Sequence, residues 1–257
     1  MHPFDEAIDL RASALADTPH EFTGATHPAY ANMIGPFGGN TAAQLLQAVM
    51  QHPDRLGEPV SITVNYAAPV ADGEIRFVAR PVRTNRSTQH WILEAHQTQN
   101  DTESVVATAT AVFAVRRETW SDVEAVMPAN VPAPDAVPRM PVKGMPAWPQ
   151  RYDMRFVEGS FPAAFDEQEQ AHSRSTLWVR DEPERALDFA SLAALSDSFF
   201  PRIYIRRRRR ALIGGAVLVG LAALAFAWAA DEATEAFHRL ATANRWLPLL
   251  LTPLGFA

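Results

Sequence analysis

The sequence predicts an α+β fold made of two successive helix-and-strand units. Apolar residues recur at helical spacing over residues 37–51, whereas over residues 60–115 they alternate with polar ones, as in antiparallel strands. Strand and helix patterns begin again at residue 151, after a proline-rich stretch. The chain of 257 residues is long enough for one large or two small domains with a hydrophobic core.

The spacing of the apolar residues predicts a helix over residues 37–51. Gly38 and Gly39 precede it as a tight entry, and either Asn40 or Thr41 can cap its first turn. Its apolar residues lie on one helical face: Ala42, Leu45, Leu46 and Val49.

Strands with a period of two follow this helix. We expect them at residues 60–66, 74–82, 88–97 and 104–117, with one or two more near residues 21–34. In the first of these strands, Val60, Ile62, Val64 and Tyr66 form the expected buried face. One long helix with a curved antiparallel sheet around it is the arrangement called a hotdog.

A second, shorter unit follows the proline-rich stretch. Two strands are expected at residues 151–158 and 175–181, and a helix over residues 187–200. Asp188 is a plausible cap for this helix, with Leu192, Leu195 and Phe199 on one side. The fold is therefore predicted to be a tandem, or double, hotdog, with antiparallel sheets each wrapped around a long helix.

The second hotdog is expected to be incomplete, because the residues after Phe200 do not alternate as strands do. Arg206–Arg210 lead instead into residues 211–230, which carry no charge and predict an apolar helical tail. We expect four regions: 1–126 as the first hotdog domain, 127–149 as a linker without secondary structure, 150–205 as a partial second hotdog domain and 206–257 as a divergent Arg/Ala/Leu-rich tail.

Composition narrows the function. The absence of cysteine excludes disulfides, thiolate metal sites and cysteine nucleophiles. Before Arg206 the chain has 16 basic and 26 acidic residues, and such an acidic body argues against nucleic-acid binding. No spacing of His, Asp or Glu suggests a metal, and no serine-hydrolase motif surrounds Ser196 or Ser198. The N-terminus lacks a signal-peptide pattern, which favours a cytoplasmic location.

Five phrases in order carry a family resemblance: MIGPFGGNTAAQLLQAV, VNYAAPV, ARPVRTNRSTQHW, TAVFAVRRETW and LDFASLAALSDSFFPRI. Together they resemble the acyl-CoA thioesterase II family, the double-hotdog thioesterases, over residues 20–205 or so. The C-terminal part departs from that family. The resemblance implies hydrolysis of acyl-CoA to a free acid and CoA in fatty acid metabolism, without a covalent intermediate, metal or other cofactor.

The resemblance also implies site residues. In the family, an Asp of the second-half helix holds the attacking water together with a Thr and a Gln from later strands, and Asp197 falls on that Asp. From spacing alone, Asp197 could equally be a solvated helix residue. The candidate substrate-binding residues are two glycines at the helix entry and a polar loop that could otherwise be a solvated hairpin: Gly38, Gly39, Arg83, Asn85, Arg86 and Ser87.

The family's Thr and Gln have no counterpart after Phe200, so the sequence leaves catalysis open. The alternative is a catalytically inactive acyl-CoA-binding or assembly module, in one version tethered to a membrane through residues 211–230. We interpret the tail first as the product of a reading-frame change in a GC-rich gene. A membrane anchor and a soluble buried or partner-binding helix are the alternatives. Under each of these interpretations we expect a homo-oligomer.

Overall fold

The computed structural model describes residues 1–14, 20–99 and 101–209. The chain divides into two compact units, Met1–Phe161 with Ala171–Ile205, and Pro162–Gln170 with Arg206–Ala257. The predictions for residues 211–230, and the interpretations of the tail, lie outside the described residues.

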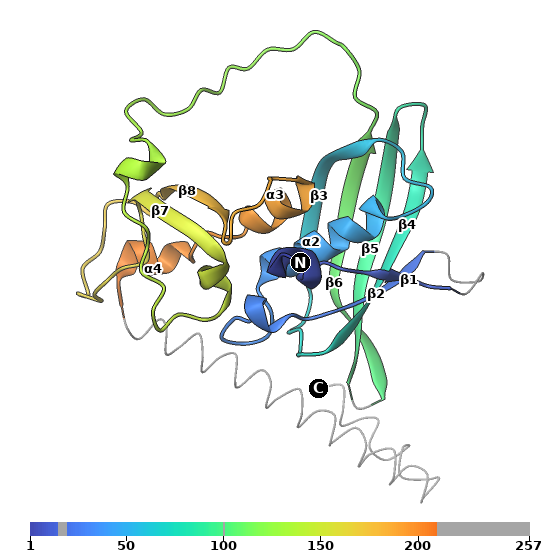
Figure 1. Ribbon diagram of the computed structural model, residues 1–257, viewed down its shortest axis with the longest axis horizontal. Helices are drawn as coiled ribbons and strands as arrows, with labels where there is room; N and C mark the ends of the chain where they lie inside the picture. Colours follow the sequence, from blue (N-terminus) through green and yellow to red (C-terminus); the bar gives the residue numbers. More distant parts are fainter. Residues whose placement is uncertain (15–19, 100, 210–257) are drawn as a thin grey trace, which may run out of the picture. The chain divides into compact units, whose positions relative to one another are not determined.

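The first half of the chain forms a six-stranded antiparallel sheet (Figure 1). Its strands lie in the order β1-β2-β4-β5-β6-β3. The strands are β1 (Arg11–Ala12), β2 (Glu21–Ala25), β3 (Glu58–Tyr66), β4 (Glu74–Thr84), β5 (Thr88–Gln99) and β6 (Thr102–Ala114). The helical segments are α1 (Pro3–Ala7), the 3-10 turn η1 (Pro28–Tyr30) and α2 (Gly38–Met50).

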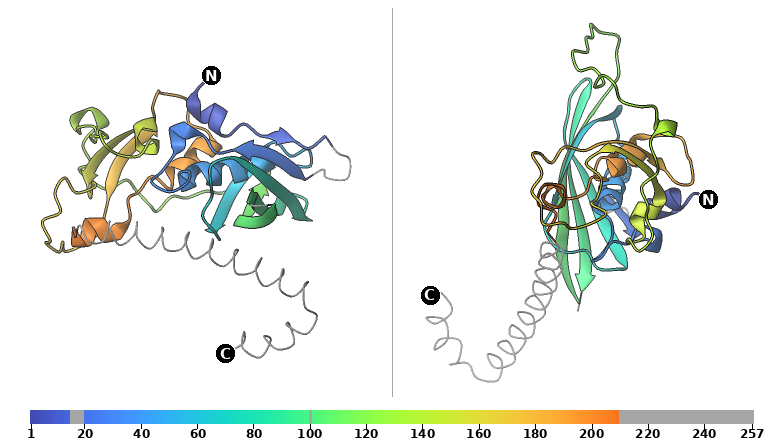
Figure 2. Two further views of the ribbon diagram at one scale, coloured as in Figure 1. Left: turned by 90° about the horizontal axis from the view of Figure 1, so that it is seen from below. Right: turned by 90° about the vertical axis from the view of Figure 1, so that its left-hand side faces the viewer.

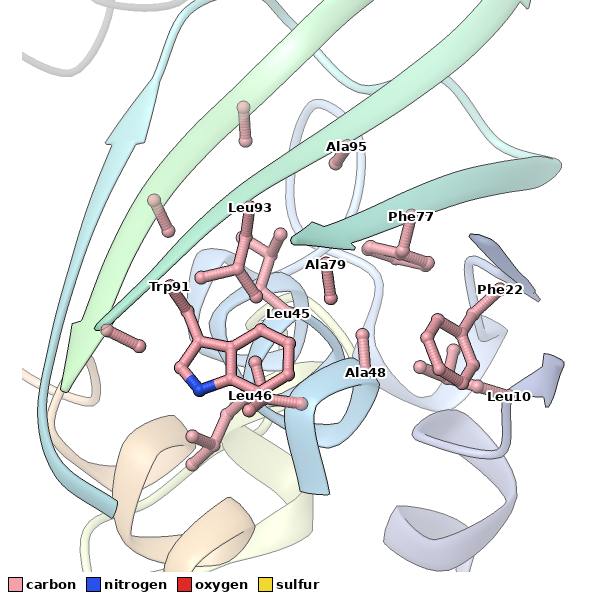
Figure 3. Close-up of a cluster of buried hydrophobic side chains, with 14 of the residues drawn as sticks. Leu10, Phe22, Leu45, Leu46, Ala48, Phe77, Ala79, Trp91, Leu93 and Ala95 are labelled. Carbon is pink, nitrogen blue, oxygen red and sulfur yellow. The ribbon is translucent and has the colours of Figure 1, made fainter. Parts of the chain in front are cut away.

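Helix α2 lies along one face of the curved sheet (Figures 1 and 2). Leu45 and Leu46 on α2 contact a core that the alternating residues of β4, β5 and β6 complete (Figure 3). Phe77, Trp91 and Phe113 in these strands are at most 1% exposed. The alternating residues of β4, β5 and β6 therefore form the inward face of the sheet, as the period of two indicates.

Two details of this half differ from the prediction. Helix α2 already begins at Gly38, with Phe37 as its N-cap and no side-chain cap, so Asn40 and Thr41 are buried inside the helix. In β3, Val60 and Tyr66 are 54% and 50% exposed rather than buried. The reason is that β3 is an edge strand, with an irregularity in its pairing with β6 between Pro59 and Ser61.

The second half contains β7 (Tyr152–Glu158) paired with β8 (Thr176–Asp181), followed by α3 (Phe189–Leu195) and α4 (Arg202–Arg207). Asp188 caps α3 as expected, since its carboxylate accepts the Ser191 N–H at 2.8 Å. Of the three residues predicted on one side of this helix, Leu195 is buried, but Leu192 is 54% exposed and Phe199 is 40% exposed. The other buried residues are Ala190, Ser191 and Ala194, because α3 packs against α2.

The proline-rich stretch is more ordered than the expected linker. It contains the 3-10 turn η2 (Pro134–Ala136) and the start of η3 (Trp148–Arg151). The indole of Trp148 stacks on Phe37 with ring centroids 4.3 Å apart, and the Met140 N–H donates to the Met154 carbonyl at 2.7 Å. Seven prolines indicated an unstructured linker, but apolar side chains between them pack into the second core.

In residues 1–14, 20–99 and 101–209, none of the helices is long and apolar enough to cross a bilayer.

Candidate functional site

The candidate site lies where the start of α2 meets the turn after α3. Asp197 stands two residues beyond the last residue of α3, in a turn closed by a hydrogen bond from its N–H to the Ala194 carbonyl at 3.1 Å. The sequence predicted Asp197 inside a helix over residues 187–200, whereas the helix ends before it. The backbone N–H of Gly39 lies close enough to the Asp197 carboxylate to lower its pKa. This contact joins the two halves of the chain.

The start of α2 has two glycines because neighbouring parts of the chain approach its backbone too closely for a side chain. A Cβ on Gly39 would lie 2.5 Å from the Ala194 carbonyl oxygen and 2.5 Å from Phe37 Cε1. A Cβ on Gly38 would lie 2.7 Å from Asp197 Oδ2. Gly39 therefore lets α2 and α3 come together, and Gly38 leaves room for the carboxylate.

The electrostatics of the site suit a base. Burial raises the pKa of Asp197, and the nearby Gly39 N–H opposes this by stabilising the charged form. The residue still exposes part of its surface, so water can reach it. The positive end of the α2 dipole favours negative charge at the same point. A carboxylate with a raised proton affinity can accept a proton nearer to neutral pH than a solvated one.

Tyr66 is a part of the site that sequence reasoning missed. Its hydroxyl donates to the Gly38 carbonyl at 2.7 Å, and its oxygen lies 3.1 Å from the position of a Gly38 Cβ. Burial of the hydroxyl and the nearby charge of Asp197 both raise the pKa of Tyr66, which keeps the phenol protonated at neutral pH. Alternation assigned Tyr66 to the core, and only its position at the end of a strand hinted otherwise.

The polar loop lies at the other end of α2. Arg83 Nε donates to Asn85 Oδ1 at 3.0 Å, and the Ser87 carbonyl accepts the Val115 N–H at 3.0 Å, so the loop is a structured hairpin. Gln89, just after it, donates to the Asp54 carbonyl, beyond the C-terminus of α2. A helix of 13 residues spans about 20 Å, so Arg83, Asn85, Arg86 and Ser87 are not brought together with Asp197.

Metal chemistry has no candidate in this part of the molecule. Within the described ranges, no group of three or more His, Asp or Glu side chains could hold a metal ion.

The sequence matches two protein-family domains. The acyl-CoA thioesterase N-terminal domain matches residues 27–114, and the acyl-CoA thioesterase C-terminal domain matches residues 128–250. The second match continues past Arg206, where we expected the resemblance to end. A search among curated proteins gave no match.

Solved structures share the fold. A conserved hot dog fold protein of unknown function from Alicyclobacillus acidocaldarius is 47% identical, covering 81% of this chain and 74% of that one, with a TM-score of 0.71. A candidate thioesterase II from Thermobifida fusca YX is 16% identical, with coverage of 80% and 74% and a TM-score of 0.65. Acyl-CoA thioesterase II TesB2 from Mycobacterium marinum is 21% identical, with coverage of 76% and 68% and a TM-score of 0.54. The predicted α+β tandem hotdog is thus confirmed.

Proposed function

Because the chain belongs to the acyl-CoA thioesterase family, we propose that it hydrolyses acyl-CoA to a free acid and CoA at the junction of α2 and α3. The observation that carries this proposal is the Asp197 carboxylate held against Gly38 and Gly39 at the start of α2. It supports the role that the sequence assigned to these three residues.

In the proposed reaction, Asp197 accepts a proton from a water molecule as the water oxygen attacks the thioester carbon. The tetrahedral intermediate then collapses with cleavage of the carbon–sulfur bond. The protonated Asp197 returns its proton to the departing CoA sulfur, so the carboxylate is regenerated and the products are the free acid and the CoA thiol. No covalent enzyme intermediate is needed, because a thioester carbonyl is already activated.

The start of α2 is our candidate for stabilising the developing oxyanion. The first N–H groups of a helix lack partners within the helix, and the helix dipole adds positive potential there. A backbone donor of this kind contributes about 2.7–4 kcal/mol to transition-state stabilisation.

The acyl or pantetheine chain needs an apolar slot beside Asp197. A groove of ≈ 350 Å³ between β8 and α3 is lined by Ser196, the neighbour of Asp197, and by apolar residues that include Leu187, Leu192 and Leu195. Arg180 lines the same groove and is a candidate partner for CoA phosphates. Contact of the hairpin around Arg83 and Arg86 with CoA stays a prediction, since that hairpin lies at the far end of α2.

Release of free thiol from acyl-CoAs of several chain lengths tests the proposal. We expect activity in the wild-type chain and a loss of about 100-fold or more in kcat for Asp197→Asn, as is usual when a general base is removed. Asp122→Asn, a change at an exposed residue between β6 and η2, is the matched control and keeps wild-type kcat. Absence of turnover in every chain, with acyl-CoA binding retained, would instead support the inactive binding module.

A further inference from the structure

We propose that the phenolic oxygen of Tyr66 is the second acceptor that orients the attacking water, alongside Asp197. This inference rests on the proposed function, because it assigns a further residue to the same reaction. It also addresses a gap: the resemblance implies side-chain partners for the water from later strands, and these have no counterpart in the sequence.

The positions of the two oxygens support the assignment. Asp197 Oδ2 lies 2.7 Å and Tyr66 Oη lies 3.1 Å from the same point above Gly38, where a Cβ would stand. The two oxygens are therefore separated by less than about 6 Å, a gap that a single water molecule can bridge with hydrogen bonds of ordinary length. Asp197 and Tyr66 are both exposed residues, so water can reach the pair of oxygens from the surface.

The hydrogen-bond inventory of Tyr66 determines its role. A phenol has one proton to donate, and Tyr66 donates it to the Gly38 carbonyl at 2.7 Å. The lone pairs of the phenolic oxygen accept no hydrogen bond from any described residue, so they are available to a water proton. The Gly38 bond also fixes the oxygen, since β3 and α2 hold its two ends.

A water in this position donates one O–H to Asp197 and the other to Tyr66. Its oxygen then directs a lone pair away from both acceptors, toward the thioester carbon. During attack the first proton passes to Asp197, while the second remains on the water oxygen and stays hydrogen-bonded to Tyr66. Tyr66 gains and loses no proton in the cycle. Its contribution is orientation, which acts on kcat and leaves substrate binding unchanged.

The first test is the kinetics of Tyr66→Phe, which removes the hydroxyl and keeps the ring. We expect kcat to fall about 10-fold or more, with KM within twofold of wild type and a melting temperature lowered by only a few degrees, because the bond to the Gly38 carbonyl is lost as well. Tyr30→Phe is the matched control, because it removes a buried hydroxyl that has no partner in the described part of the chain. It keeps wild-type kcat.

The second test separates the water from the Gly38 bond. A ring-fluorinated tyrosine at position 66 is a better donor and a poorer acceptor than tyrosine, so it keeps the Gly38 bond and weakens the bond to water. The proposal predicts a lower kcat; wild-type kcat or a KM effect alone would overturn it. If Tyr66→Phe retains full kcat while Asp197→Asn is inactive, the Tyr66 assignment fails and the proposed function stands. If both variants retain full kcat, the proposed function itself fails.

Discussion

The two helices that meet at the site have very different surroundings. The first, α2, is covered by a six-stranded sheet, whereas α3 has only the two-stranded sheet β7–β8 beside it within the described residues. Gly38, Gly39 and Tyr66 come from the well-covered half, and Asp197 comes from the other. The comparison teaches that the first half fixes the backbone of the site, while the second brings the reactive carboxylate to it.

Their cores differ in the same sense. The core around α2 is built from aliphatic and aromatic side chains such as Leu45 and Trp91, which are at most 1% exposed. Buried polar atoms without a partner among the described residues include Asn40 Oδ1 on α2, but more of them lie in the core around α3: Tyr30 Oη, Tyr152 Oη and Asp181 Oδ1. Each such group costs about 1–3 kcal/mol when buried unpaired. We therefore expect the first half to provide most of the stability.

Truncating one leucine in each core gives the largest expected effect. Leu45→Ala should lower the free energy of unfolding by about 2–5 kcal/mol, because Leu45 is fully buried and leaves a cavity. Leu195→Ala should cost about 1–2 kcal/mol, since Leu195 borders the groove beside β8 and can be replaced by solvent on that side. Urea denaturation measures both. Equal losses would break the comparison and indicate that α3 is covered as fully as α2.

Alanine at each glycine of α2 sharpens the comparison at the contact itself. Gly39→Ala places a methyl group 2.5 Å from a backbone oxygen of α3, so the helices must separate, and we expect a loss of about 1–3 kcal/mol together with activity. Gly38→Ala meets the ends of two side chains, Asp197 Oδ2 at 2.7 Å and Tyr66 Oη at 3.1 Å, and the Asp197 side chain can move aside. It should reduce kcat with a smaller loss of stability, measured by a thermal melt and thiol release. Comparable melting temperatures for the two variants would contradict this.

How much of this could be predicted depends on the kind of signal. The period of the apolar residues located α2, β4, β5, β6 and the strands of the second half, because burial on one face imposes that period. The period failed at Val60, which is exposed on an edge strand. Whether a strand lies at an edge depends on the order of strands in the sheet, and the sequence of one strand does not reveal that order. The period also failed at Leu192 because α3 buries its small residues against α2.

The site was predicted in part for a similar reason. Asp197 was predicted from the family resemblance and the two glycines from the helix entry, and the structure brings these three residues together. Tyr66 was missed because its position beside Gly38 depends on how β3 ends relative to α2, which is a tertiary property. The hairpin at Arg83 was grouped with them only because it is polar, and the length of α2 separates it from Asp197.

The smallest expected effect is a pH dependence that belongs to the first half. His52 is buried, its Nδ1 accepts the Asp54 N–H, and its Nε2 lies 2.8 Å from His20 Nδ1. Burial chiefly, and His20 next, lower the pKa of His52, while Asp54 opposes them. Protonation thus favours the unfolded chain: this contribution is complete above about pH 6.5 and is lost as pH falls through the lower folded-state pKa.

The variant His52→Asn tests this, because an amide oxygen can accept the Asp54 N–H and does not titrate. We expect the free energy of unfolding of the wild type to decline between pH 7 and about pH 5, and the variant to decline less. Urea denaturation at several pH values gives the slopes. Identical slopes for the two chains would show that His52 does not contribute to the pH dependence of stability.

The junction of α2 and α3 as a catalytic site is tested most directly by the pH profile of kcat/KM for acyl-CoA hydrolysis. This profile reports the pKa of the essential base in the free enzyme. Because burial raises the pKa of Asp197, activity should decline with falling pH at values above the ordinary aspartate range of about 3.9. Asp197→Asn should abolish that limb along with most of the rate. An Asp197→Asn chain that keeps the wild-type rate and profile would contradict the account.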